Sequence, residues 1–192
     1  MKNLGRFKFI ICLMVLLIPY ICFGKNEKIL FVIAYTNFRD EEFLKPQKIL
    51  KDNGYEIEVC SWKKGTAKGM LGEKVSVNLT LEEVKPEDYA GIIFVGGTGS
   101  MNFFDDKNAI FLARDFCNKK KPVGAICLAP VILARAGILK GKKVTCYDNK
   151  EEFEKVEAIY TGKDVEVDGN IVTGNGPEAA EKFGKTFLKL LK

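Results

Sequence analysis

The sequence of 192 residues contains no histidine. This absence removes the commonest general base, the commonest transition-metal ligand and any Ser-His or Cys-His catalytic pair. Cysteines are present, but none form a C-x-x-C pair, so a structural zinc site is not expected. The glycine-rich stretch Gly96–Ser100 lacks both the spacing of a dinucleotide-binding fingerprint and the lysine of a P-loop. We therefore expect neither a metal nor a cofactor.

A clustered basic face is also missing. The net charge is +5, but residues 1–24 carry three of the 30 basic residues and none of the 25 acidic ones, so the remainder carries only +2. The run Lys119–Lys121 is explained by a solvated loop before a strand. Binding to nucleic acid is not expected.

One long apolar run is present, and it lies at the N-terminus. Three basic residues precede Phe9–Ile18, and Gly24 offers a small residue for cleavage. This pattern predicts a signal peptide over residues 1–24, followed by a single domain over residues 25–192. The mature protein is expected to be secreted or periplasmic and not embedded in a membrane; an uncleaved leader would anchor it.

The rest of the chain alternates between apolar runs of strand length and amphipathic stretches of helix length. This order predicts a single α/β domain, a three-layer sandwich around a mainly parallel sheet. A hairpin is predicted within 65–77 and another around Asp168-Gly169-Asn170. The predicted strands are Ile29–Ala34, Tyr55–Cys60, Gly91–Val95, Val123–Ile126 and Val144–Tyr147, and the predicted helices are Arg39–Leu50, Ala109–Cys117, Val131–Ala136, Glu151–Val156 and Glu178–Leu191.

Cys127 stands at an abrupt turn between a predicted buried strand and a predicted helix. Such a turn lifts a side chain above the sheet edge, and the helix N-terminus favours the thiolate. The segment alone is equally compatible with an ordinary core cysteine, because free cysteines are commonly buried. Two other loops should lie at the same sheet edge, the Glu41-Glu42 turn and the Gly96-Gly97 turn. Acidic residues at a helix start are usually explained by the helix dipole alone.

Three pieces of the sequence, in this order, resemble the ThiJ/PfpI superfamily. They are the acidic turn Asp40–Glu42 followed by Pro46, the strand ending in Gly96-Gly97, and the elbow Ala125–Pro130. The resemblance continues through Val165–Asn170 and the Gly176-Pro177 turn, and so covers nearly the whole chain after the leader. It implies a flavodoxin-like fold, similar to class I glutamine amidotransferases.

The resemblance also implies roles for individual residues. Cys127 would be the nucleophile and Glu42 its partner, while the amides of Gly97 and Leu128 would form an oxyanion hole. A protonated carboxyl in a poorly solvated cleft can donate a hydrogen bond to a thiolate and lower the pKa of the thiol. Further residues expected to line the site are Tyr147, Gly96 and Pro177.

The sequence departs from the family at two positions. PfpI-type members have histidine directly after the cysteine, where this chain has Leu128. Several glyoxalase-like members have histidine on the following strand, where we place Tyr147. Cys-His peptidase chemistry is therefore not expected.

The leading interpretation is a stress-protection protein with glyoxalase-like or deglycase-like chemistry on small reactive carbonyls at Cys127. The alternative is a non-catalytic redox-sensing or chaperone-like protein. The expected partner is a small electrophile or oxidant. By resemblance to the family, the chain is also expected to form a homo-oligomer, a dimer or a hexamer.

Overall fold

The computed structural model describes residues 27–192. The predicted signal peptide lies outside the described residues and stays a prediction. Among residues 27–192, no helix is both long enough and apolar enough to cross a membrane.

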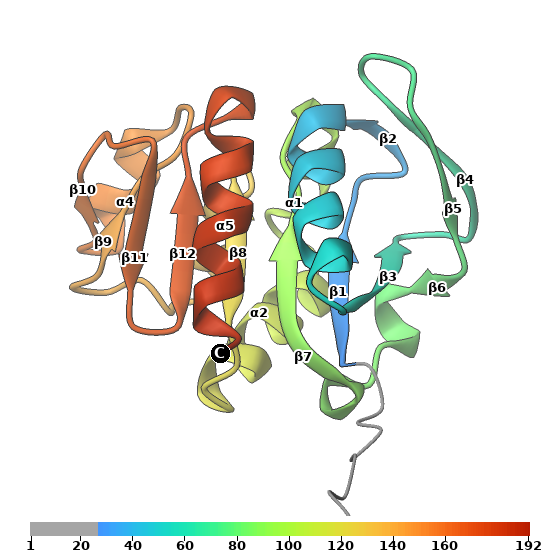
Figure 1. Ribbon diagram of the computed structural model, residues 1–192. Coiled ribbons are helices and arrows are strands. Elements are labelled where there is room, and N and C mark those ends of the chain that lie inside the picture. The colour runs from blue at the N-terminus through green and yellow to red at the C-terminus, as the bar shows by residue number, and fades with distance from the viewer. Residues whose placement is uncertain (1–26) are drawn as a thin grey trace, which may run out of the picture.

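A seven-stranded sheet forms the centre of the molecule (Figure 1). Its strands follow the order β11-β12-β8-β7-β1-β3-β6, and all neighbours are parallel except β11 and β12. The central strands are continuous apolar runs because both faces of the sheet are covered. The strands are β1 (Lys28–Val32), β3 (Glu56–Ser61), β6 (Leu79–Thr80), β7 (Tyr89–Phe94), β8 (Val123–Ile126), β11 (Val165–Asp168) and β12 (Ile171–Gly174).

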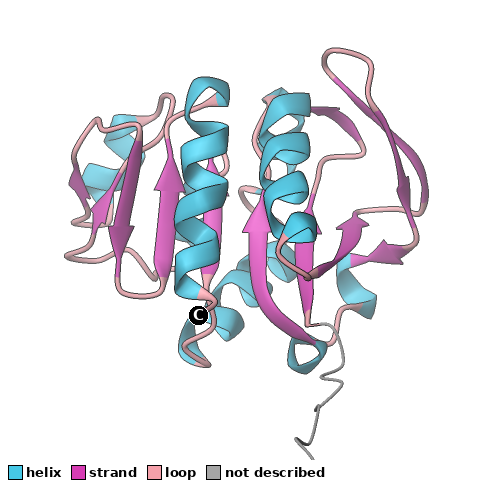
Figure 2. Ribbon diagram, viewed as in Figure 1, coloured by secondary structure: helices cyan, strands magenta, loops and turns pink. Residues whose placement is uncertain are grey.

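Helices cover both faces of this sheet, as Figure 2 shows. Helices α1 (Asp40–Asp52) and α5 (Ala180–Leu190) pack together on one face, and α2 (Lys107–Asn118) packs against β7 and β8 on the other. Short helix α3 (Pro130–Arg135) follows β8 and contacts α2 and α4 (Lys150–Lys155). The predicted three-layer α/β sandwich is confirmed.

Two glycines in the sheet make room for the rings of α5. A Cβ at Gly91 would lie 2.9 Å from Phe187, and one at Gly124 would lie 2.8 Å from Phe183. Both phenylalanines are fully buried. The apolar stripe of α5 therefore sits directly on the backbone of β7 and β8, the two strands that lead to the glycine turn and to Cys127.

The predicted hairpin within 65–77 is present as β4 (Gly65–Gly69) and β5 (Lys74–Val77). It belongs to a separate three-stranded sheet, because β2 (Thr36–Phe38) pairs with β4. Strand β2 was not predicted, since three residues give too short an apolar pattern to distinguish it from a loop. The remaining short elements are 3₁₀ turns: η1 (Leu81–Glu83), η2 (Pro86–Asp88), η3 (Thr98–Phe103) and η4 (Pro177–Ala179).

The predicted strand Val144–Tyr147 is wrong in its extent and its place. Strand β9 spans only Lys143–Val144 and pairs with β10 (Ile159–Tyr160) in a separate two-stranded sheet. Residues 145–147, which follow β9, make other contacts: the Thr145 amide donates to the Thr173 hydroxyl (2.9 Å), and the Tyr147 amide donates to the Cys127 carbonyl (3.0 Å). Tyr147 therefore lies on a loop.

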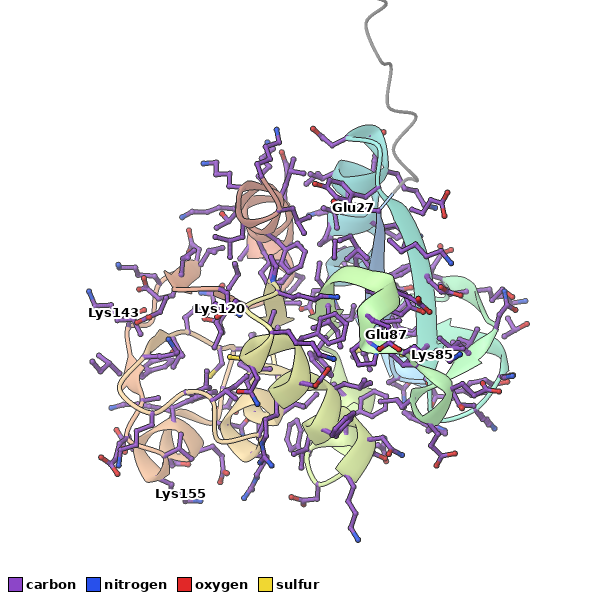
Figure 3. The ribbon with its side chains drawn as sticks, turned by 90° about the horizontal axis from the view of Figure 1, so that it is seen from below. Glu27, Lys85, Glu87, Lys120, Lys143 and Lys155 are labelled. Carbon is purple, nitrogen blue, oxygen red and sulfur yellow. The ribbon has the colours of Figure 1, made fainter. Side chains whose placement is uncertain are left out.

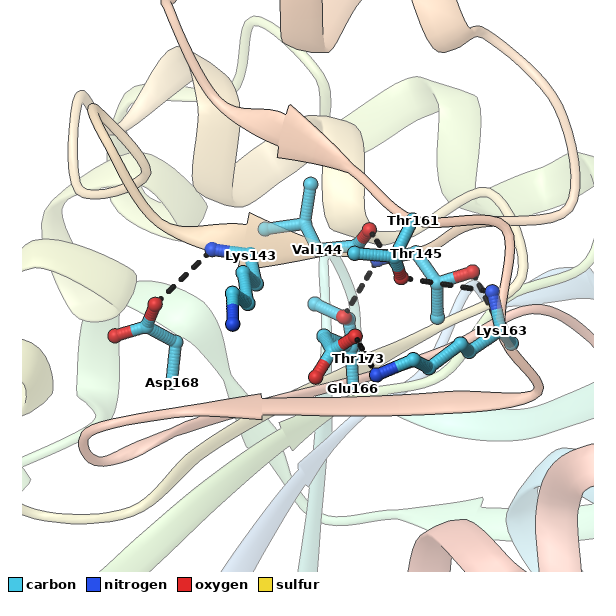
Figure 4. A network of polar contacts seen from close by, with 8 residues as sticks. All are labelled: Lys143, Val144, Thr145, Thr161, Lys163, Glu166, Asp168 and Thr173. Carbon is cyan, nitrogen blue, oxygen red and sulfur yellow. Dashed lines mark hydrogen bonds and ion pairs between the residues drawn. The ribbon is translucent and has the colours of Figure 1, made fainter.

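Polar contacts fasten this small sheet to β11 and β12, as Figure 4 shows. The Thr145 hydroxyl donates to the Lys163 carbonyl (2.6 Å), Lys163 pairs with the buried Glu166 (3.1 Å), and the Lys143 amide donates to Asp168 (3.0 Å). The loop that carries Tyr147 is thus fixed to the edge of the central sheet.

The end of the sheet opposite to the strands' carboxyl ends is charged. Viewed from that end, Glu27, Lys85, Glu87 and Lys120 project outward (Figure 3). A shallow hollow of about 360 Å³ lies there, between Glu27 and Lys121. These groups are far from Cys127 and form an ordinary solvated surface.

Asp40 ties the hairpin to the start of α1. Its carboxylate is buried and accepts hydrogen bonds from the amides of Leu71 and Glu73, both at 2.8 Å. Gly69 is required beside it, since a Cβ there would lie within 2.6 Å of the Asp40 carboxylate. The acidic first turn of α1 therefore serves tertiary structure as well as the helix dipole.

We expect Asp40→Ala to lower the free energy of unfolding by about 2–4 kcal/mol, because two charge-assisted hydrogen bonds are lost and two amides lose their partner. Equilibrium urea denaturation measures the change. Asp52→Ala on the same helix is the control, since it removes only an exposed ion pair with Lys48 and should cost less than about 1 kcal/mol. Equal effects of the two substitutions would contradict this role for Asp40.

Candidate functional site

Cys127 lies at the carboxyl end of β8 with φ of +64°, in the left-handed region that non-glycine residues seldom adopt. Its amide donates to the Gly174 carbonyl of β12 (2.9 Å), and its carbonyl accepts from the Tyr147 amide (3.0 Å). Such a conformation costs about 1–3 kcal/mol and persists where neighbouring contacts hold it. The sharp strand-to-helix turn predicted from the sequence is present.

Glu42 lies directly beneath this turn. Its side chain is fully buried, its Oε2 accepts from the Gly96 amide at 3.1 Å, and its carboxyl lies beside the Cys127 side chain, close enough for each group to shift the pKa of the other. Gly96 must lack a side chain, because a Cβ there would lie 2.5 Å from Glu42 Oε2 and 2.6 Å from Cys127 Cβ. The structure thus brings Glu42, Gly96 and Cys127 together, as the resemblance implied.

Burial dominates the acid-base properties of this pair. Burial raises the pKa of Glu42 from 4.5 to about 8, against the opposing effects of Cys127, the Gly96 amide and Arg39. Burial, followed by the charge of Glu42, raises the pKa of the Cys127 thiol to about 12. Near neutral pH the carboxyl is therefore largely protonated.

The sequence analysis expected a thiol pKa below the free value, and the structure gives the opposite direction. The backbone amides of Gly97 and Leu128 lower the pKa of Cys127, but desolvation of a side chain that is only 7% exposed outweighs them. At neutral pH the cysteine is therefore a thiol.

Gly97 and Leu128, the two residues predicted to form an oxyanion hole, are those whose backbone amides lower the pKa of the Cys127 thiol. Gly97 has φ of +93°, and a Cβ there would lie 2.5 Å from both the Arg39 nitrogen and the Asn37 carbonyl oxygen. Only glycine fits this backbone. The two amides can therefore stabilise negative charge on an atom bonded to Cys127.

A pocket of about 430 Å³ opens above Cys127. Predicted residues Gly97, Leu128, Tyr147 and Pro177 line it, whereas Glu42 and Gly96 lie below its floor. Tyr147 contributes a largely exposed ring at the rim. The full set of lining residues is Arg39, Met70, Gly97, Thr98, Cys127, Leu128, Tyr147, Asp148 and Pro177.

Four of the lining residues were not predicted: Arg39, Met70, Thr98 and Asp148. Arg39 directly precedes the acidic turn, and Asp148 directly follows Tyr147, so their nearness in the chain to predicted site residues could have indicated that they line the pocket. Met70 gave no such signal, because Asp40 brings the hairpin tip next to the pocket only through tertiary contacts.

The other cysteines of the described chain are free thiols away from the pocket's lining. Burial raises the pKa of Cys60, of Cys117 and of Cys146. The Cys146 thiol contacts the Asp148 carbonyl. Cys60 and Cys146 are buried, whereas Cys117 is half-buried.

Comparison with known proteins identifies relatives along almost the whole described chain. A family model described as the DJ-1/PfpI family matches residues 27–190. An uncharacterized protein of Methanocaldococcus jannaschii is 46% identical over 172 residues, which cover 88% of this chain and 84% of that protein. The deglycase PfpI of Pyrococcus furiosus is 35% identical over 166 residues, covering 86% and 99% of the two chains.

A solved structure, the ThiJ/PfpI domain protein from Brachyspira murdochii, matches with a TM-score of 0.84. The two chains are 36% identical, and the match covers 88% of this chain and 98% of that one. The resemblance read from the sequence is confirmed.

The buried carboxyl predicts how stability depends on pH. Between 4.5, the ordinary pKa, and about 8, the folded protein holds a proton on Glu42 that the unfolded chain does not. The contribution of Glu42 therefore makes the free energy of unfolding fall as pH rises through this window and level off above it. Glu42→Gln should remove this component in urea denaturation at pH 5, 6.5 and 8.

Glu56→Gln, which changes an exposed carboxylate, is the matched control and should keep the wild-type pH dependence. If Glu42→Gln and Glu56→Gln gave the same pH dependence as the wild type, the raised pKa of Glu42 would be disproved.

Proposed function

Because the chain belongs to the DJ-1/PfpI family, we propose that it is a deglycase-like stress-protection protein acting on small reactive carbonyls or their adducts. Cys127 is the nucleophile, and Glu42 is the group that takes up and returns the proton. One observation carries the proposal: a fully buried carboxyl, that of Glu42, lies beside the cysteine beneath a pocket of about 430 Å³.

The reaction begins with addition of the thiol to a carbonyl carbon. A bond forms between the Cys127 sulfur and that carbon, the carbonyl π electrons move to oxygen, and the thiol proton passes to the Glu42 carboxylate. The amides of Gly97 and Leu128 stabilise the resulting oxyanion. Protonation of the oxyanion by Glu42 gives a hemithioacetal and restores the carboxylate.

Glu42 can then act a second time. When the substrate is a 2-oxoaldehyde, Glu42 removes the proton from the hemithioacetal carbon and returns it to the neighbouring carbonyl carbon, which gives a thioester of Cys127. Water then hydrolyses the thioester to a hydroxy acid and free Cys127. The same carboxyl can protonate the departing amine of a glycated adduct. Only a thiol, a carboxyl and two amides are required, and the chain supplies all of them without histidine.

The size of the pocket supports substrates larger than methylglyoxal. Pockets for small-molecule ligands typically measure about 300–1,000 Å³, a range that includes this one. A second hollow of about 530 Å³ shares Tyr147 and Pro177 with the pocket, so the amine part of an adduct has room beyond the reacting carbon. The relative in Pyrococcus furiosus carries the name deglycase.

Turnover of methylglyoxal and of its adduct with N-acetylarginine tests the proposal. We expect Cys127→Ser to abolish turnover, and Glu42→Gln to lower kcat/KM by about 10²–10⁴-fold. Cys117→Ser, at the end of α2, is the matched control and should leave the rate unchanged. Equal activity of the wild type and Cys127→Ser would contradict the proposal.

The same assay predicts a pH profile. Because the carboxylate form of Glu42 accepts the thiol proton, kcat/KM should rise with pH through the pKa of about 8 and flatten above it. A rate that falls over pH 7–9 would assign the essential proton to a different group.

A second candidate is redox sensing at Cys127. Glu42 Oε1 is buried and has no hydrogen-bond partner among residues 27–192, so the protonated carboxyl can donate to an oxygen of an oxidised cysteine. Intact-mass measurement after dilute peroxide tests this candidate. Redox sensing is supported if two oxygens add at Cys127, if this addition is lost in Cys127→Ser and slowed in Glu42→Gln, and if the protein does not turn over the carbonyl substrates.

A further inference from the structure

An ion pair lies at the start of α1, beside the candidate pocket. Arg39 lines the cavity above Cys127. Its Nε lies 2.9 Å from Oε2 of Glu41, and its Nη2 donates to Oε1 of the same carboxylate at 3.1 Å. The Nε and Oε2 atoms are buried, and neither side chain is more than 30% exposed. The pair is therefore bidentate and partly withdrawn from water, so its charges are screened less than those of an open surface pair.

A single residue, Gly96, connects this ion pair to the carboxyl of Glu42. The Arg39 amide donates to the Gly96 carbonyl at 3.0 Å, and the Gly96 amide donates to Glu42 Oε2 at 3.1 Å. Glu41 and Glu42 are neighbours in the first turn of α1. Neither hydrogen bond uses the side chain of Arg39 or of Glu41. The charges of these two side chains can therefore be removed without removing the contacts that place Glu42.

The two charges act on Glu42 in opposite directions. Burial is the largest effect and raises the pKa of Glu42 to about 8; Arg39 lowers this pKa, and Glu41 raises it by a smaller amount. The coupling is mutual: the pKa of Arg39 is raised chiefly by Glu41, and also by Glu42 and Cys127. Arg39 therefore interacts with both members of the reacting pair as well as with its own ion-pair partner.

The other ionisable groups near α1 and the pocket are engaged elsewhere. They are Asp40, Tyr147, Asp148, Glu181 and Lys185. Asp40 accepts from hairpin amides, Asp148 accepts from the Asn149 amide, and Glu181 pairs with Lys185. Tyr147 is an exposed phenol at the rim, and residues 96–100 of the glycine turn have no ionisable side chain. Among residues 27–192, Arg39 and Glu41 are thus the charges best placed to act on Glu42.

We propose that Arg39 and Glu41 are positioning residues that together set the pH at which Glu42 accepts the thiol proton. The guanidinium favours the carboxylate form of Glu42, and its ion pair with Glu41 limits that effect. Without Arg39, Glu42 would hold its proton to higher pH and accept the thiol proton less readily. Without Glu41, the unopposed cation would ionise Glu42 at lower pH and weaken it as a base. This inference rests on the proposed function and adds how its proton acceptor is adjusted.

Substitutions of opposite sign test the proposal directly. The protein is labelled with ¹³C-glutamate, and the Glu42 carboxyl signal, assigned by its loss in Glu42→Gln, is followed by NMR from pH 5 to 10. We expect Arg39→Gln to raise the midpoint of this titration by about 0.5 pH unit and Glu41→Gln to lower it by a similar amount, since a partly solvated charge acts through an intermediate dielectric. The double variant should fall between the two.

Matched controls separate this effect from a change in overall charge. Lys45→Gln, on α1 outside the pocket, removes one exposed positive charge, and Glu56→Gln removes one exposed negative charge. Both should leave the Glu42 midpoint unchanged, and Arg39→Lys, which keeps the cation, should stay close to the wild type. Shifts in the same direction for Arg39→Gln and Glu41→Gln, or no shift in either, would overturn the proposal.

Kinetics separate this inference from the proposed function. Below the pKa of Glu42, a rise of about 0.5 pH unit in the midpoint leaves about threefold less carboxylate. Arg39→Gln should therefore lower kcat/KM for methylglyoxal about threefold at pH 7, with the rising limb moved to higher pH, and Glu41→Gln should move that limb to lower pH. Opposite shifts of the NMR midpoint without turnover by the wild type would refute the enzymatic proposal alone. Turnover with an unmoved Glu42 midpoint would refute the role of Arg39 and Glu41 alone.

Discussion

The burial of the Glu42 carboxyl against Cys127 is the constraint on which the rest of the site depends. A carboxyl that is fully removed from water needs a hydrogen-bond partner or a proton: the Gly96 amide donates to Oε2, and burial beside Cys127 favours the protonated form. This contact has three requirements. Helix α1 must start directly below the sheet edge, the residue after β7 must be a glycine (Gly96), and Cys127 must adopt a positive φ after β8. Three separate loops are thereby constrained by one interaction.

The same burial lets Glu42 serve as the proton-transferring group in the proposed reaction, which uses no histidine. A solvated glutamate would remain ionised at neutral pH, but desolvation brings the pKa of Glu42 to about 8, into the range where a group can both accept and return a proton. In the proposed reaction this carboxyl therefore moves the protons, and no histidine takes part. The thiol is affected in the opposite sense, since burial makes it harder to ionise, and a proton acceptor next to it becomes essential.

The fold was largely predictable from the sequence because the strands of the central sheet are continuous apolar runs and the helices between them are amphipathic. The residue pattern pointed to Cys127 and to the Gly96-Gly97 turn, and the resemblance added the roles of Glu42 and Leu128; the structure brings these residues together. Strands β2 and β10 were not predicted and β9 was predicted with the wrong bounds, since each has only two or three residues and depends on distant pairing.

The electrostatics of the site were less accessible from the sequence. The pKa of Cys127 depends on how completely its surroundings exclude water, which no local pattern records, and the helix-terminus argument alone gave the wrong direction. Arg39 was not predicted because an ion pair with the adjoining acidic turn is enough to explain it. Its place in the pocket wall appears only when the cavity shows which side chains lie beside the cysteine.

The hydrogen bond between the Cys127 amide and the Gly174 carbonyl also has a consequence for synthesis on the ribosome. Strand β12 is the last of the central sheet to emerge, and Tyr147 and Pro177 complete the pocket from the same late part of the chain. A nascent chain that ends before β12 therefore contains the cysteine but not the contacts that hold its conformation. The pocket above Cys127 is therefore completed only when the protein is almost fully translated.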